Sequence, residues 1–486
     1  MIDDVDTPGS DGWWLAKLYN ERNAYGPRLP RERDPRRMTH MRRSKRLDTL
    51  WDYRLGRVSL PGWSRQHEDD VCEFLGYSRT AYAGLVVEAM LDRIGLVGLR
   101  TVADQDADGD DTFRRVLLER GPWLKDALDF MLSMSLGWVM VTQSADGHAI
   151  VTAEDPRDIT AAFDPIDPLS VSAALKVYRD DAAREHVAHL YLADDDSGPA
   201  RVRVARRRSG GTLGAGFGAS PWSWDDDASG PLPEPMREFG VPLVPLRNRL
   251  DVGEFEPHLD LIDRITDNIA NRLWIAKVQA YKQRALVPDA NAPELPDKDP
   301  ETGEKVDLDS LFESAPDAMW ELPPGYKLWE SAPLDMTPIL LGIRDDVKEL
   351  SAATRTPLSM FTPDAATGSA EGASLMREGI TYKAEDRIAR IAPAVSKIGR
   401  MILAAEGRDA AGEVQPMWAP VERLSMSQRA EAVRAAKESG MPFELILTEV
   451  WQMDPATAKR AMDKRFDDAL MSAVDAKAAP SADAGA

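Results

Sequence analysis

Apolar residues recur at steps of three and four along three long stretches in the second half of the chain. Such spacing places one apolar stripe along each helix, so three amphipathic helices are predicted. The first covers about 257–284, with its stripe at Leu259, Ile262, Ile265, Ile269 and Leu273. The second covers 337–356, with its stripe at Ile339, Leu340, Ile343, Val347 and Leu350. The third begins near 371, with its stripe at Leu375, Ile380, Ile388, Ile391, Val395, Ile398 and Ile402. Ordinary core packing would explain any one of them alone.

Prolines and glycines set the limits of these helices. Thr337 followed by Pro338 is typical of a helix start, and Pro357 should end that helix at Thr356. The segment 287–307 contains too many Pro, Asp and Gly residues for regular structure. The third helix would be on the order of 50 Å long, and Pro393 inside it predicts a kink.

Strand patterns lie before these helices. Alternating or continuous apolar runs between turn residues make 137–208 β-rich, and a short strand is expected near 96–102. The run VPLVPLRNR contains Pro242 and Pro245, which suit an edge strand because proline has no amide proton to donate. Residues 209–235 are rich in Gly, Ser, Trp and Pro, typical of a loop or a strand-turn insertion. Segregated helices and strands predict an α+β fold.

Both ends of the chain are predicted to be less regular. An N-terminal arm would be anchored by Trp13 and Trp14. Near the other end, three short helices are expected at 425–438, 442–452 and 455–471, with Gly440 ending the first. The Ala-rich tail to the last residue is expected to be disordered.

Composition narrows the classes of protein. The 486 residues carry a net charge of −21, whereas a protein that grips DNA is usually basic. Acidity alone is also common for solubility. The exception is the Arg-rich segment 28–46, which could contact nucleic acid, a neighbouring acidic subunit or its own chain. No membrane span and no secretory leader are expected, and the single Cys72 excludes an internal disulfide.

Chemical motifs are missing. There is no phosphate-binding G-x-x-x-x-G-K-[ST], no H-E-x-x-H, no C-x-x-C and no G-x-S-x-G, so no catalytic residue, cofactor or metal is predicted. Residues 104–109 match the first half of an EF-hand calcium loop, but Arg115 occupies the twelfth position, where a glutamate is required. We expect an acidic turn there. His186 and His189 would point to opposite faces of a strand, which disfavours a shared metal.

The order of several weak motifs resembles the portal proteins of tailed bacteriophages, of the type found in phages of actinobacteria. The motifs are VPLVPLRNR before a long helix, ELPPGYKLWE (321–330), TRTPLSMF (354–361) and GSAEGASL (368–375). Upstream, LDTLWDYRLGR (47–57) and YAGLVVEAMLDRIGLVGLRT (82–101) resemble the family's early helix end and its helix-to-strand connection. The resemblance extends over about 47–470.

This resemblance implies a portal-like subunit with a wing, a two-helix stem, a clip, a long kinked helix and a C-terminal helical crown. The implied divisions are an N-terminal arm (1–46), the first part of the wing (47–256), a stem helix (257–284), the clip (285–336), a second stem helix (337–356), a tunnel loop (357–372), the long wing helix (373–420), the crown (421–471) and a disordered tail (472–486). Candidate DNA-channel residues are Phe361, Thr362, Thr367 and Ser369, and candidate stem or clip residues are Lys282, Arg284 and Lys327.

The resemblance further implies a ring, by analogy a dodecamer, at one capsid vertex, through which double-stranded DNA is packaged and ejected without sequence preference. Its partners would be the terminase large subunit, major capsid and scaffold proteins, and head-tail connector proteins, in a virion assembled in the host cytoplasm. Three alternatives stay open. They are another capsid or connector component, an enzyme with an unrecognised site, and a nucleic-acid binder that uses the segment 28–46.

Overall fold

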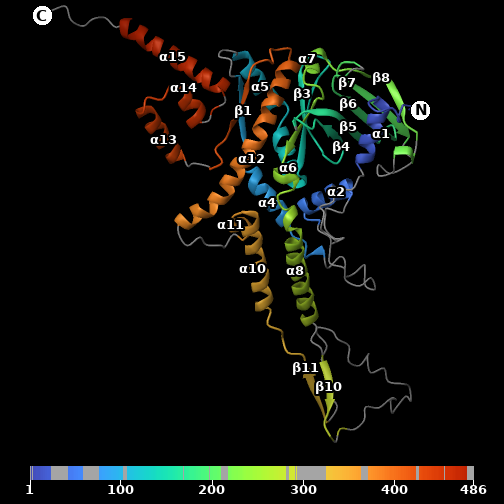
Figure 1. The fold of residues 1–486 in the computed structure, drawn as a ribbon. Coiled ribbons are helices and arrows are strands. Elements are labelled where there is room, and N and C mark those ends of the chain that lie inside the picture. The colour runs from blue at the N-terminus through green and yellow to red at the C-terminus, as the bar shows by residue number, and fades with distance from the viewer. Residues whose placement is uncertain are drawn as a thin grey trace, which may run out of the picture. The chain divides into compact units, whose positions relative to one another are not determined.

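A computed structural model gives the fold of the chain (Figure 1). It describes residues 2, 4–22, 42–57, 76–101, 107–167, 169–195, 198–208, 217–219, 221–280, 284–290, 292, 325–362, 370–422, 426–451, 453 and 455–478. The chain forms two compact units. The main unit comprises Met1–Leu55, Ala83–Pro257 and Thr354–Ala486, and the inserted unit comprises Gly56–Tyr82 and His258–Ala353.

The helices and strands are as follows. The helices are α1 (Asp11–Glu21), α2 (Arg43–Arg54), α4 (Tyr82–Leu91), α5 (Ala107–Glu119), α6 (Trp123–Met134), α7 (Glu234–Arg237), α8 (Leu259–Ala280), α10 (Thr337–Thr354), α11 (Leu358–Phe361), α12 (Ala370–Ala405), α13 (Met426–Glu438), α14 (Phe443–Leu445) and α15 (Pro455–Ala478). The strands are β1 (Leu96–Thr101), β2 (Leu136–Gln143), β3 (Ala149–Glu154), β4 (Ile159–Phe163), β5 (Val171–Asp180), β6 (Glu185–Leu192), β7 (Arg201–Arg208), β8 (Ser223–Pro231), β9 (Leu243–Arg247), β10 (Arg284–Pro288), β11 (Tyr326–Glu330) and β12 (Val414–Trp418).

The main unit contains three antiparallel sheets, with strand orders β4-β5-β6-β7-β8, β3-β2-β9 and β1-β12. Strand β9 lies at an edge, as its prolines predict. Its Pro245 is opposite Trp138 of β2, and the Pro242 carbonyl accepts from the Val141 amide at 3.0 Å. The predicted α+β class and the strand near 96–102 are therefore confirmed.

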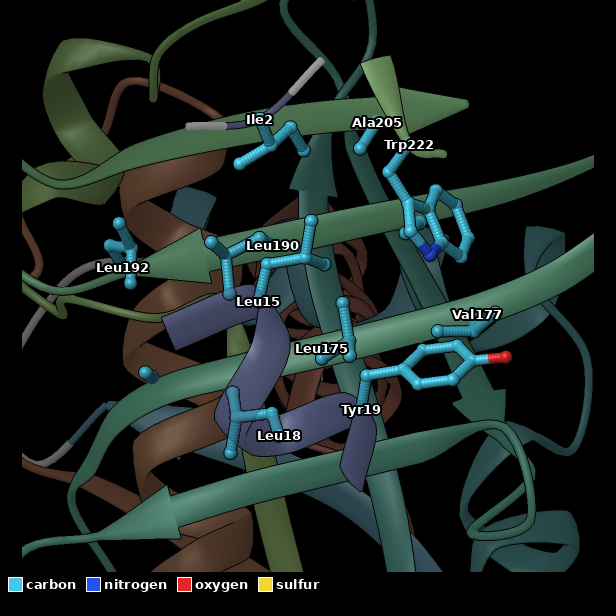
Figure 2. Packing of buried hydrophobic residues seen from close by; sticks show 12 residues of the cluster. Ile2, Leu15, Leu18, Tyr19, Leu175, Val177, Leu190, Leu192, Ala205 and Trp222 are labelled. Atoms are coloured by element: carbon cyan, nitrogen blue, oxygen red, sulfur yellow. The ribbon is translucent and has the colours of Figure 1, made fainter. Parts of the chain in front are cut away.

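Helix α1 packs on one face of the five-stranded sheet (Figure 2). Leu15, Leu18 and Tyr19 of this helix lie in a buried cluster with Leu175 and Leu190 from neighbouring strands. The other face of the same sheet contributes to a second cluster with β2 and β9. Because β5 has buried side chains on both faces, this sheet is the centre of the main unit's core.

Several predicted boundaries need correction. The arm 1–46 contains the packed helix α1, whose wholly buried residues are Leu15, Leu18 and Tyr19. Of the two predicted anchors, Trp14 packs against this cluster and is partly buried. In the segment 209–235, strand β8 pairs with β7, which agrees with a strand-turn insertion and not with a loop alone.

Other corrections concern helix ends. Helix α12 ends at Ala405, before the predicted end at 420, and the chain then turns through Gly407 at φ +69° into strand β12. Helix α15 continues to Ala478, into the tail predicted to be disordered, because alanine has the highest helix propensity. The expected acidic turn is wrong at Asp108 and Gly109, which lie in α5.

Candidate interaction surface on the inserted unit

Two antiparallel helices form the body of the inserted unit. Arg264 of α8 lies 2.9 Å from Asp346 and 2.5 Å from Glu349 of α10. One turn further along α8, the Asn268 amide donates to Asp346 at 2.9 Å. As the position advances along α8, its partner moves back along α10, so the two helices run in opposite directions. These three contacts between the helices are polar.

Beyond these helices in sequence, a two-stranded antiparallel ribbon joins β10 to β11 (Figure 1). The register places Ala285 opposite Trp329 and Val287 opposite Lys327. Lys327 Nζ lies 2.9 Å from Asp289 Oδ1, with both side chains exposed. An exposed pair of this kind contributes at most about 1 kcal/mol, so the ion pair does not by itself hold the ribbon together.

The N-terminus of helix α10, which follows β11 in the chain, is capped by a side chain. The Thr337 amide donates to the Asp335 carboxylate at 2.9 Å. A hydrogen bond from the Thr337 side chain, and then this amide bond, hold the pKa of Asp335 below its ordinary value of 3.8. The predicted helix start is confirmed to within one residue, although the capping side chain is Asp335 and not Thr337.

Burial is uneven along the two helices. Ile262, Ile265 and Ala270 of α8 and Val347 and Leu350 of α10 are buried. Among the described side chains, none of α8 after Ala270 and none of α10 before Val347 is buried. Among the described residues, the portion of each helix nearest the ribbon in sequence therefore contributes no fully buried side chain.

This part of the inserted unit instead exposes large apolar side chains. Leu340 and Leu341 of α10 are 37% and 51% exposed, and Trp329 of β11 is 52% exposed. Leu328 and Val287 of the ribbon are also exposed. We call these five residues the exposed apolar surface. Charged groups flank it on α10, including Arg344 and Lys348.

Two charged groups of α8 have shifted pKa values. Hydrogen bonds from Arg264 to Glu349 are the main reason why the pKa of Arg264 is raised above its ordinary value. Asp267, which is half-buried, has its pKa raised by burial. Arg264, Asp346 and Glu349 thus join the two helices.

The residues predicted to line a stem, clip or channel are dispersed. Lys327 is exposed on β11, and Arg284 begins β10, so the predicted helix 257–284 stops before it, at Ala280. Lys282 lies outside the described residues.

Of the channel-loop candidates, Phe361 ends the short helix α11 and is only 8% exposed, which counts against contact between its ring and DNA. Thr362 is half-buried, and its hydroxyl donates to the Leu358 carbonyl at 3.3 Å. Thr367 and Ser369 lie outside the described residues.

Part of the Arg-rich segment 28–46 binds its own chain. The Arg43 guanidinium donates to the carbonyls of Pro156 and Ile159 at 3.0 and 2.8 Å. Arg46 makes a bidentate contact with Glu256, at 2.7 and 2.6 Å. These two arginines are therefore engaged within the main unit, and residues 28–41 lie outside the described part of the chain.

The main unit has a groove lined by Trp51, Trp123 and Phe130. Asp129, one of the carboxylates in this groove, is held by Arg54 at 2.8 and 2.9 Å. No group of three potential metal ligands occurs among the described residues. None of the described helices is both long enough and apolar enough to span a bilayer.

The two histidines lie in strand β6, as predicted. His186 accepts a hydrogen bond from buried Arg207 at 3.2 Å, whereas His189 lies 3.4 Å from the Tyr178 hydroxyl. Each ring thus has its own partner.

No family model matches the chain, and no curated protein matches it. It is similar to solved portal and neck structures. An HK97-family phage portal protein from Corynebacterium diphtheriae is 11% identical, with 70% of this chain and 95% of that chain covered and a TM-score of 0.34. The neck of a native GTA particle computed with C12 symmetry is 12% identical, with 82% and 95% covered and a TM-score of 0.39. The neck of an empty GTA particle computed with C6 symmetry is 10% identical, with 78% and 93% covered and a TM-score of 0.40.

Proposed function

We propose that this protein is the subunit of a phage portal, a ring at one capsid vertex through which double-stranded DNA enters and leaves. The motif order in the sequence resembles that family. The observation that carries the proposal is the exposed apolar surface of the inserted unit, at the ribbon and at the end of α10 nearest to it in sequence, where no described side chain of α10 is buried. A neighbouring copy in a closed ring would bury this surface through a head-to-tail contact.

The magnitude of this burial is significant. Fully burying a leucine contributes about 1.5–3 kcal/mol. Leu340 and Leu341 are about half exposed, so covering both would contribute about 1.5–3 kcal/mol per interface. Exposed Trp329 would add to this term if the ribbon also meets a neighbour. Since every subunit in a ring has two such contacts, a small term per residue accumulates around the ring.

Net charge fits the same role. A chain with a charge of −21 would repel the phosphate backbone, so DNA could slide through a channel without adhering to it. In this proposal, the inserted unit supplies the stem and clip, and the main unit supplies the wing and crown. The clip would meet the terminase large subunit during packaging and a connector protein afterwards, while the wing would face capsid and scaffold proteins.

The candidate channel residues keep this assignment only in part. Thr362, Thr367 and Ser369 remain proposed as polar positions near DNA, and Lys282, Arg284 and Lys327 remain proposed at the stem and clip. Phe361 is better assigned to the core, because its side chain is buried within the main unit.

The test is oligomeric state, measured on the full-length protein by mass photometry and negative-stain electron microscopy. The wild-type protein should form rings with a central hole at a mass near that of twelve subunits, by analogy with the family. The variant Leu340→Ser/Leu341→Ser should shift the sample toward monomer and small oligomers. Leu118→Ser is the matched control, because Leu118 of α5 is 71% exposed but lies in the main unit.

Ring loss in the Leu340→Ser/Leu341→Ser variant alone would support the proposal. Equal ring loss in both variants would show that the exposed apolar surface of the inserted unit has no specific role in holding the ring together. Wild-type protein that stays monomeric or forms only small oligomers, both alone and when co-expressed with capsid and scaffold proteins, would refute the portal assignment and favour an enzyme.

A further inference from the structure

A buried ionic network joins α12 to the loop that precedes the inserted unit. Glu254 has a side chain only 3% exposed, and both of its oxygens are engaged. Lys383 Nζ lies 2.7 Å from one oxygen, and Arg387 Nε lies 2.7 Å from the other. Lys383 and Arg387 are four residues apart, so they project from the same face of α12.

The same lysine reaches a second segment. Lys383 Nζ also donates to the Thr354 carbonyl at 2.9 Å, at the last residue of α10. Carbonyl groups at a helix C-terminus have no partner within the helix and attract a cation. The lysine therefore joins the carboxylate of Glu254 to the end of α10.

The loop that carries Glu254 is fixed on its other side. The Glu254 amide donates to the Leu132 carbonyl at 2.7 Å. At Gly253, a Cβ atom would lie 2.3 Å from the Ser133 carbonyl oxygen, so only glycine allows this approach. These backbone contacts fix the position of Glu254 independently of its side-chain contacts.

The location of these residues along the chain is informative. The chain leaves the main unit after Pro257 and returns to it at Thr354. Glu254 precedes the first point by three residues, and Thr354 is the second point. The bond between Lys383 and Thr354 also closes the base of the segment 355–382, which contains α11 and the beginning of α12.

We propose that Glu254, Lys383 and Arg387 form a lock within the main unit, which holds the two chain positions that flank the segment His258–Ala353, Glu254 and Thr354, on helix α12. The proposal concerns the folded subunit and does not depend on the portal assignment.

Charge balance explains why the lock is stable once formed. Burial alone would raise the pKa of Glu254, but the charges of Lys383 and Arg387 more than offset it, so this pKa lies below its ordinary value of 4.5. Arg387 Nη1 also contacts Asp386 Oδ2 at 2.5 Å, which supplies a second negative charge. Removing Glu254 alone would leave two buried cations with a single carboxylate between them.

The test is amide hydrogen exchange, read by mass spectrometry on the full-length protein. In Glu254→Gln, exchange should accelerate about a hundredfold at residues 253–262 and at the last turn of α10, since breaking a buried pair costs a few kcal/mol locally. The five-stranded sheet should keep its wild-type rate. Glu154→Gln is the matched control, because Glu154 pairs with Lys176 at 2.6 Å in the main unit and is also buried. Glu154→Gln should leave the exchange rate unchanged at residues 253–262 and at the last turn of α10.

A second variant separates the two ends. Lys383→Met keeps the Glu254–Arg387 pair, so exchange should accelerate at the last turn of α10 and stay nearly unchanged at residues 253–262. Uniform acceleration across the main unit in Glu254→Gln would mean general destabilisation and would overturn the lock. Unchanged exchange at both ends, or the same effect from Glu154→Gln, would overturn it as well.

Discussion

Tyr19 provides a precise test of how α1 is joined to the main unit. Its ring is fully buried, and its hydroxyl accepts a hydrogen bond from Arg207 Nη2 at 2.5 Å. The Arg207 guanidinium is itself buried against the rings of Tyr19 and Trp222, at 5.1 and 4.6 Å from their centroids. Its Nε donates to His186 at 3.2 Å.

The substitution Tyr19→Phe removes one hydroxyl and keeps the ring. Core contacts and the cation–π contact therefore stay, and the lost term is the hydrogen bond to a charged group, worth about 1.5–3 kcal/mol. Among the described residues, Arg207 Nη1 already has no partner, so the guanidinium has little means to compensate. We expect the free energy of unfolding to fall by about 2 kcal/mol.

Urea unfolding followed by tryptophan fluorescence measures this change. Tyr178→Phe is the control, because the Tyr178 hydroxyl lies 3.4 Å from His189 and its contact is longer and only partly buried. That variant should lose less than about 1 kcal/mol. If Tyr19→Phe loses no more than Tyr178→Phe, the buried bond to Arg207 is not what fastens α1 to the sheet.

Three further predictions concern single groups. The pKa of His186 is lowered below its ordinary value of 6.5, by burial first and by Arg207 second, so its neutral form is favoured in the folded state. Its contribution to stability is then complete above pH 6.5 and is lost as the pH falls from there through the folded pKa. The urea midpoint of His186→Gln should therefore depend less on pH than that of the wild-type protein, and an equal dependence in the two proteins would contradict this. Asp335→Ala should remove the cap and accelerate amide exchange in the first turn of α10, and an unchanged rate there would exclude the cap. Arg264→Gln removes an exposed ion pair with Glu349 and a pair with the more buried Asp346, while Arg264 itself is about half exposed. The free energy of unfolding should therefore fall by less than about 1 kcal/mol, measured by urea unfolding, and a larger loss would show that the pairs act as a buried network.

Local patterns predicted the elements whose cause is local. Helical periodicity identified α10, and the proline in its first turn fixed its start. Strand β9 was predicted at an edge because Pro242 and Pro245 have no amide proton, and it does lie at the edge of its sheet. Gly440 was predicted to end α13, and its φ of +81° is one that glycine adopts readily.

Elements that depend on distant partners were missed. Strand β12 pairs with β1, with Thr101 opposite Val414, and no pattern within residues 414–418 distinguishes it from a loop. Helix α1 has its partners in β5, β6 and β7, so its sequence alone predicted an arm anchored by Trp13 and Trp14 and did not identify Leu15, Leu18 and Tyr19 as its buried residues. Long-range pairing is a property of the folded chain, and a local window does not contain it.

The candidate surface shows the same limit in a single helix. Leu340, Val347 and Leu350 belong to one stripe of α10, and the periodicity treats them alike. The structure separates them, because Val347 and Leu350 are buried within the chain and Leu340 is not. Among the described residues, the stripe of α10 therefore continues past the core that buries Val347 and Leu350. Covering Leu340 would be as favourable per unit of apolar area as covering Val347. This is why the ring proposed above assigns this end of α10 to a contact with a neighbouring copy of the chain.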